Sequence, residues 1–130
     1  MAGNVDTIKS AFEAFHNGDA EGMKAAWTDD IRWEGSGTDE LPGGGVHEGA
    51  DDVLAALGSI RERWDSFQAE PDEFIEDGDT VVVLGHVEGS TNGNDVKTPF
   101  VQIWRMQDGK AKRVQALIDT LQVGRALGVA

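Results

Sequence analysis

The chain has 130 residues, of which 39% are hydrophobic and 27% are charged, and it contains no cysteine. This length favours one domain over residues 1–130, and the lack of cysteine excludes disulfides, a thiolate nucleophile and cysteine-held metals. The 24 acidic residues outweigh the 11 basic ones, and the resulting net charge of −13 opposes binding to nucleic acid and to anionic membranes.

The expected location follows from the apolar runs. None approaches the roughly 20 residues that a membrane-spanning helix needs. The first ten residues, MAGNVDTIKS, lack a basic-then-apolar signal pattern. We therefore predict a cytoplasmic protein without a membrane partner. The acidic residues are spread along the chain, which fits either a device for solubility or adaptation to a high-salt habitat.

The first part of the chain predicts two helices. Apolar residues recur at steps of three and four in Val5, Ile8, Phe12 and Phe15, the pattern of an amphipathic helix. We expect this helix over residues 5–17, with Asn4 as its N-cap and Gly18 as its end. A short second helix is expected over residues 20–27, with Asp19 as its cap.

A strand, a loop and a third helix follow. Ile31 and Trp33 alternate with charged residues in DDIRWEG, which is typical of a strand. Residues 35–49 are rich in glycine, so they predict a loop. Residues 50–65 carry an apolar stripe with helical spacing and predict a helix.

The rest of the chain predicts four strands. The first spans residues 66–77, and Pro71 within it indicates an edge position or a bulge. Three more strands are expected between Thr80 and Val123, joined by polar hairpins at STNGND and QDGK. The predicted order is therefore α-α-β-α-β-β-β-β. Helices followed by an antiparallel meander define an α+β fold, in which the helices cover one face of the sheet.

Four segments resemble the nuclear transport factor 2-like superfamily, in particular its SnoaL-like and ketosteroid isomerase-related branch. They are AFHNGDAEGM, WTDDIRWEG, LPGGGVHEGADDVLAAL and IWRMQDGKAKRVQALIDT. The resemblance covers residues 5–123. It implies a cone, in which a curved antiparallel sheet wraps around three N-terminal helices and encloses an apolar pocket. It also implies a homodimer formed through the outer face of the sheet.

The resemblance does not extend to steroid isomerase chemistry. Ketosteroid isomerases use an Asp base and an oxyanion hole made from a Tyr and a protonated Asp. Matching the shared segments places the Tyr at Ala11, the base at Gly35 and the protonated Asp at Val101. All three functional groups are missing, and the chain has no tyrosine. The Arg and Asp pair of limonene epoxide hydrolase-like members is also missing, because Gln107 follows Arg105 at that spacing.

Two residues are candidates for acid–base catalysis. The resemblance places an acid of the polyketide-cyclase branch at Asp119, in the final predicted strand. As a general base it would take a proton next to a carbonyl, although regular alternation would turn it away from the pocket. His47 lies in the glycine-rich loop, and its ordinary pKa suits proton transfer at neutral pH. The alternative for each is an exposed side chain without a catalytic role.

The resemblance and strand alternation together define the expected pocket wall. Alternation places Trp104 and His86 on the outer face of the sheet. The predicted wall consists of Phe15, Trp33, Trp64, Val101, Ile103, Val114, Ala116 and Ile118.

Three functions remain open from the sequence. The first is an enzyme of cyclase or isomerase type that moves a proton on a hydrophobic carbonyl compound. The second is a protein that binds a hydrophobic small molecule without chemistry. The third is a dimerisation domain. We expect no cofactor and no metal, because the three histidines are widely separated.

Overall fold

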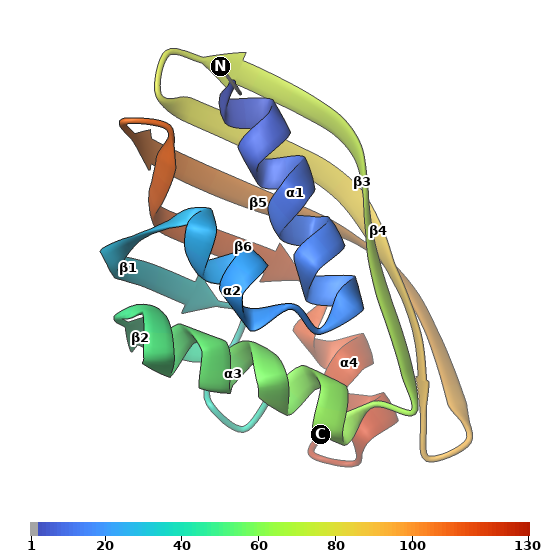
Figure 1. Cartoon of the computed structure of the whole chain (residues 1–130). Coiled ribbons are helices and arrows are strands. Elements are labelled where there is room, and N and C mark those ends of the chain that lie inside the picture. The colour runs from blue at the N-terminus through green and yellow to red at the C-terminus, as the bar shows by residue number, and fades with distance from the viewer. Residues whose placement is uncertain (1–2) are drawn as a thin grey trace.

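A curved sheet with helices on its concave side makes up the molecule (Figure 1). The structure is a computed structural model that describes residues 3–130. In chain order, the helices and strands are α1 (Asn4–Asn17), α2 (Ala20–Ala25), β1 (Trp27–Gly35), β2 (Gly45–Glu48), α3 (Ala50–Arg63), β3 (Ser66–Asp77), β4 (Thr80–Thr91), β5 (Asn94–Gln107), β6 (Lys110–Ile118) and α4 (Thr120–Leu127). The α+β prediction is confirmed, with helices α1, α2 and α3 covering one face of the sheet.

The strands follow the order β2-β1-β6-β5-β4-β3. Every neighbouring pair is antiparallel except β1 and β6, which run parallel. The parallel pair joins the first strand of the chain to the last one. Through it, the antiparallel strands β3 to β6 form one sheet with β1 and β2 of the N-terminal half. This pairing brings Trp33 opposite Val114 and places both on the concave face.

Two helix ends differ from the expected ones: the first cap, described next, and the end of α2, which lies at Ala25, so that Trp27, expected as the last residue of this helix, begins β1. Gly3 is the N-cap of α1, and Asn4 is already helical, so the prediction of Asn4 as the cap was wrong. Gly18 ends α1 with a φ of 67°, a left-handed conformation that favours glycine. The carboxylate of Asp19 caps α2 by accepting a hydrogen bond from the backbone N–H of Gly22 at 2.9 Å.

The interpretation of Pro71 is confirmed in both of its parts. Strand β3 is the last strand of the sheet order, so it lies at an edge. The register of β3 against β4 shifts between Pro71 and Glu73. Proline has no backbone N–H to donate, and an edge strand with a bulge accommodates that loss.

Two elements were not predicted. Strand β2 lies in the expected loop of residues 35–49, where it pairs with β1 through residues 45–48. Helix α4 replaces the last part of the expected final strand, which ends at Ile118. Val123, Ala126 and Leu127 recur at helical spacing in this segment and are buried against Trp64 and Val96. Helical packing therefore outweighs the strand pattern after residue 118.

A bulge in β6 decides which residues face the concave side. Met106 of β5 pairs with Ala111 of β6, whereas the preceding Arg105 pairs with Arg113. Lys112 is therefore an extra residue on β6, and it reverses the alternation of every β6 residue that follows. Side chains opposite one another on neighbouring strands share a face, so the bulge sets the wall of the concave side.

The bulge corrects the predicted faces of β5. Val101 and Ile103 were expected to share a face with Val114, Ala116 and Ile118, as a regular hairpin would require. The observed partners of those three β6 residues are Trp104, Gln102 and Phe100. Val101 and Ile103 therefore point to the outer face. Trp104 points inward and is 2% exposed, so its predicted outer position was wrong.

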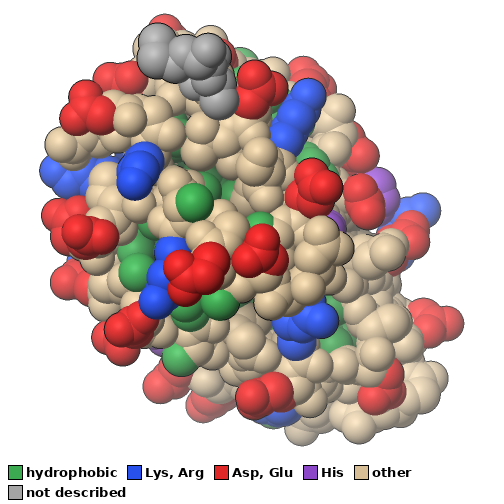
Figure 2. Space-filling model, in the orientation of Figure 1, with side chains coloured by type: hydrophobic (Ala, Val, Ile, Leu, Met, Phe, Trp, Pro, Cys, Tyr) green, Lys and Arg blue, Asp and Glu red, His purple; other side chains and the backbone are tan. Residues whose placement is uncertain are grey.

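Acidic side chains are distributed over the helical side of the molecule rather than gathered in one patch (Figure 2). Such a spread keeps like charges apart and presents negative charge to solvent from many directions. None of the helices within residues 3–130 has the length and apolar character that crossing a membrane requires.

Candidate functional site

An apolar cavity of about 140 Å³ lies between the helices and the concave face of the sheet. All four tryptophans line it, together with Phe12, Phe15, Phe67 and Phe100. The helices, the sheet and the loop after β1 all contribute to the wall. The sequence folds this way because each element turns its apolar stripe towards the same interior.

The predicted wall residues divide into two groups. Phe15, Trp33, Trp64, Ala116 and Ile118 line the cavity. Val114 is fully buried on the same face of the sheet but does not reach the lining, and Val101 and Ile103 lie on the outer face.

Sequence reasoning missed the lining residues of β5, which are Phe100, Gln102 and Trp104. The available signal was the pattern of the whole strand, because both aromatic side chains share one parity and the charged residues Asp95, Lys97 and Arg105 share the other. Sequence reasoning also missed Leu41, Pro42 and Gly43, which reach the cavity from the loop between β1 and β2.

Aromatic contacts hold the cavity wall in place. The ring of Trp104 meets Trp33 edge-on at a centroid distance of 6.3 Å. It also meets Phe12 of α1 at 6.3 Å, and Phe12 stacks on Phe100 at 6.0 Å. These spacings lie within the range at which aromatic pairs attract one another. Trp104 therefore ties the sheet to helix α1 directly beside the cavity.

Few polar side chains line the cavity. The indole Nε1–H of Trp104 donates a hydrogen bond to the Oε1 atom of Gln102 at 2.9 Å. An indole nitrogen only donates, so this contact fixes which end of the amide is the oxygen. This contact uses the oxygen of the amide, so the N–H groups on Nε2 of Gln102 can donate to another group. The hydroxyl of Ser36 donates to the backbone carbonyl of Ala116 at 2.6 Å.

The two candidate catalytic residues lie outside the lining. Asp119 is exposed and caps α4, where its carboxylate accepts a hydrogen bond from the backbone N–H of Gln122 at 3.0 Å. His47 is half-buried in β2, and its Nε2 atom lies 2.8 Å from the carbonyl oxygen of Gly44, to which it donates. No Asp, Glu, His, Lys or Arg side chain lines the cavity in the part of the chain that the structure describes.

The positions matched to the isomerase residues carry no chemistry. Ala11 and Gly35 line the cavity, but neither has a functional group. Val101 was matched to the protonated Asp and was expected in the cavity wall. It lies on the outer face, so that expected location was wrong. Within residues 3–130, no group of three or more His, Asp or Glu side chains is arranged to hold a metal ion.

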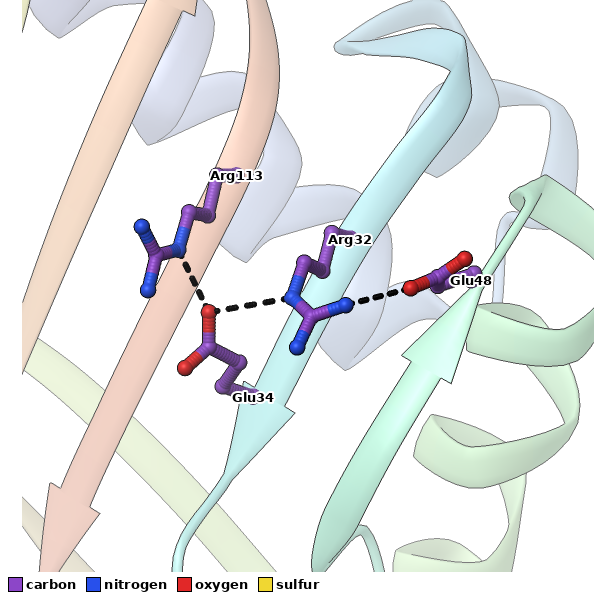
Figure 3. A network of polar contacts seen from close by, with 4 residues as sticks. All are labelled: Arg32, Glu34, Glu48 and Arg113. Carbon is purple, nitrogen blue, oxygen red and sulfur yellow. Dashed lines mark hydrogen bonds and ion pairs between the residues drawn. The ribbon is translucent and has the colours of Figure 1, made fainter.

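An ion-pair network occupies the outer face of the sheet (Figure 3). Glu34 of β1 accepts hydrogen bonds from Arg113 of β6 and, at 3.3 Å, from Arg32, which also pairs with Glu48 of β2. The pKa of the Glu34 carboxyl is lowered, chiefly by the hydrogen bond from Arg113; burial opposes this effect and Arg32 adds to it. The contacts of the charged Glu34 carboxylate with the two arginines therefore stabilise the folded protein at neutral pH. This stabilisation is lost as the pH falls through the lowered pKa of Glu34.

Comparison with solved structures identifies the class of proteins to which this fold belongs. A structure of a nuclear transport factor 2-like protein of unknown function from Burkholderia pseudomallei is 32% identical, with a TM-score of 0.88 and 98% of each chain covered. TerC, co-crystallised with polyporic acid, is 30% identical, with a TM-score of 0.87, and the match covers 96% of this chain and 98% of TerC. The class is therefore that of the nuclear transport factor 2-like proteins.

The family follows from the sequence. Residues 8–114 match the SnoaL-like domain, and the chain belongs to this family. A putative SnoaL-like polyketide cyclase from Jannaschia shares the fold, with a TM-score of 0.84 at 19% identity over 98% of this chain and 92% of the other. Among curated proteins, no sequence matches this chain significantly.

Proposed function

We propose that this protein binds a small, largely apolar ring compound in the cavity between its helices and its sheet. The observation that carries the proposal is the lining, which combines eight aromatic side chains with no ionisable one among the described residues. Ligand sites in proteins are mostly apolar and aromatic, with a few polar groups that orient the ligand. Gln102, held by Trp104, is such a group.

The size of the cavity limits the ligand. Its volume of about 140 Å³ is close to the roughly 150 Å³ of an engineered apolar cavity that binds benzene. Pockets for drug-sized ligands start at roughly 300 Å³. One ring with a short substituent therefore fits inside, and a larger ligand has to extend beyond the enclosed space. The proposed contacts include Phe15, Trp33, Trp64, Ala116 and Ile118.

Binding is favoured over proton-transfer catalysis. A general base has to come within hydrogen-bond reach of the proton that it removes. Asp119 and His47 lie outside the lining, and each already has a backbone partner. The relative TerC was co-crystallised with polyporic acid, which supports small-molecule binding by a protein 30% identical to this one.

Titration calorimetry with benzene, isopropylbenzene and polyporic acid tests the proposal. We expect at least one of these compounds to bind with 1:1 stoichiometry. Ala116→Phe should abolish binding, because the new ring fills the cavity. Gln115→Phe is the matched control, since the neighbouring residue of β6 lies on the outer face opposite Ile103, and it should bind as the parent does. Absence of binding to all three compounds, or loss of binding in both variants, would contradict the proposal.

We further propose that the protein forms a homodimer through the outer face of its sheet. Six apolar side chains form a stripe there, across β3 to β6: Ile75, Val82, Leu84, Val101, Ile103 and Leu117. Leu117 is 56% exposed, which is unusual for a leucine in the middle of a sheet. A contiguous exposed apolar patch is typical of an interaction surface.

A single charge in the stripe should separate the subunits. Leu117→Glu is expected to give a monomer that stays folded, because the side chain is largely exposed in the single chain. Light scattering at micromolar concentration measures the mass. Leu121→Glu on α4 is the control, since Leu121 is about as exposed as Leu117 but belongs to a helix and not to a strand of the sheet. A monomeric parent protein would refute the proposed dimer.

A further inference from the structure

The side chain of Gln102 is turned towards the cavity. Gln102 lies opposite Ala116 on the concave face of the sheet, and both residues line the cavity. Its neighbours on that face, Phe100, Trp104 and Val83, are at most 5% exposed, whereas Gln102 is only half-buried. The accessible surface of Gln102 therefore opens onto the cavity that the residue lines.

The hydrogen bond from Trp104 decides which end of the Gln102 amide remains available. The indole N–H donates to Oε1, and reversing the amide would bring the N–H groups of Nε2 against another donor. Trp104 is itself held by its ring contacts with Phe12 and Trp33. The donor end of the amide is therefore fixed in place before a ligand arrives, which lowers the cost of ordering it on binding.

The nitrogen of this amide can be reached by another molecule. Among residues 3–130, the one fully buried side-chain nitrogen or oxygen atom without a hydrogen-bond partner is Nε1 of Trp27. Within the same residues the amide of Gln102 makes its hydrogen bond through Oε1, so Nε2 is unpaired without being fully buried. Ser36 also lines the cavity, but its hydroxyl proton is already donated to the carbonyl of Ala116.

We propose that Nε2 of Gln102 donates a hydrogen bond to an acceptor oxygen of the cavity ligand. This inference rests on the proposed binding function and specifies the class of ligand, which is a ring compound that carries a carbonyl, quinone or ether oxygen. An ammonium group has no acceptor, so it does not match Nε2. A neutral oxygen also fits a wall without an ionisable side chain in the described part of the chain, since a buried charge would lack a counter-ion there.

Nuclear magnetic resonance of the Gln102 side-chain amide tests the inference in the parent protein. Acetophenone and isopropylbenzene have nearly the same shape, but acetophenone has a carbonyl oxygen in place of a methyl group. We expect acetophenone to move one Nε2 proton of Gln102 downfield and isopropylbenzene to leave both without such a shift. Assignment through bonds identifies the Gln102 signals without any variant, so this measurement does not depend on the folding of a mutant.

Affinity measurements on two variants complete the test. Gln102→Met removes the amide and keeps an unbranched side chain, and it should lower the ratio of acetophenone to isopropylbenzene affinity about fivefold, the effect of one lost hydrogen bond. Leu57→Met is the matched control, because it places the same side chain elsewhere in the wall. A change of wall shape alone acts on both compounds alike, so Leu57→Met should keep the ratio of the parent.

The outcomes separate this inference from the proposed function. If acetophenone binds without a downfield shift of a Gln102 Nε2 proton, or with such a shift confined to an indole N–H, the inference is overturned and the binding function stands. The same holds if a compound of the calorimetric test binds and acetophenone does not, or if both variants lower the affinity ratio equally. If neither acetophenone nor any compound of the calorimetric test binds, both proposals fail.

Discussion

Replacing Trp104 by alanine is expected to lower the free energy of unfolding by about 4 kcal/mol, within the range measured for large-to-small changes in protein cores. The side chain is 2% exposed, so its removal leaves a void inside the core. Its ring contacts Phe12 and Trp33, and its N–H group holds Gln102. Since domains of this kind are stable by roughly 5–15 kcal/mol, this loss is a large part of the total.

Urea unfolding followed by circular dichroism measures the loss, and Ile103→Ala is the matched control. Ile103 is the neighbour of Trp104 on β5 and points to the outer face, where it is half-buried. Its truncation should cost only about 1 kcal/mol, a typical value for a point substitution. A regular β5–β6 hairpin would place Ile103 inward and Trp104 outward. A larger loss for Ile103→Ala than for Trp104→Ala would therefore show that β6 has no bulge.

Replacing Gly35 by alanine or aspartate is expected to destabilise the protein by about 3 kcal/mol, at the upper end of the cost of overpacking. A Cβ atom at Gly35 would lie 1.9 Å from the carbonyl oxygen of Gly43 and 2.9 Å from the Cα atom of Gly44. Both are backbone atoms of the loop between β1 and β2, so the loop has to move. Gly35→Asp would put a carboxyl group at the position matched to the isomerase base, but in a displaced loop. We expect it to show no steroid isomerase activity.

Thermal unfolding of Gly35→Ala and Gly58→Ala checks the steric argument. A Cβ atom at Gly58 in helix α3 meets no atom within 4 Å. Alanine favours the helix over glycine by up to about 1 kcal/mol. Gly58→Ala should therefore raise the melting temperature while Gly35→Ala lowers it. A melting temperature for Gly35→Ala equal to that of the parent would contradict the close approach of the two backbone segments.

Much of the fold could be predicted from local patterns. The helical spacing of apolar residues located α1 and α3, and alternation around Ile31 and Trp33 located β1. Pro71 indicated both the edge strand and the bulge that the structure has. These signals are local, because one helix or strand already shows which of its faces is apolar. The α+β class followed from the order of those elements.

The site was less predictable, because it depends on register. The extra residue Lys112 in β6 exchanged the faces of the β5 residues relative to β6. As a result the wall contains Phe100, Gln102 and Trp104 in place of Val101 and Ile103. Both sets contain apolar residues, and only the aromatic rings on one parity of β5 and the charged residues on the other distinguished them. Asp119 was misplaced for a related reason, since the strand pattern continued past the point where α4 begins.

The sequence by itself determined the fold class, most element positions, the SnoaL-like family and the absence of the isomerase residues. Only the tertiary structure decided which side chains face the cavity, that Asp119 caps a helix, and that the Trp27 N–H is buried without a partner among residues 3–130. The physical reason is the range of the interactions. Propensity and periodicity act within one element, whereas a bulge, a cavity wall and an unpaired donor arise only when distant segments are packed together.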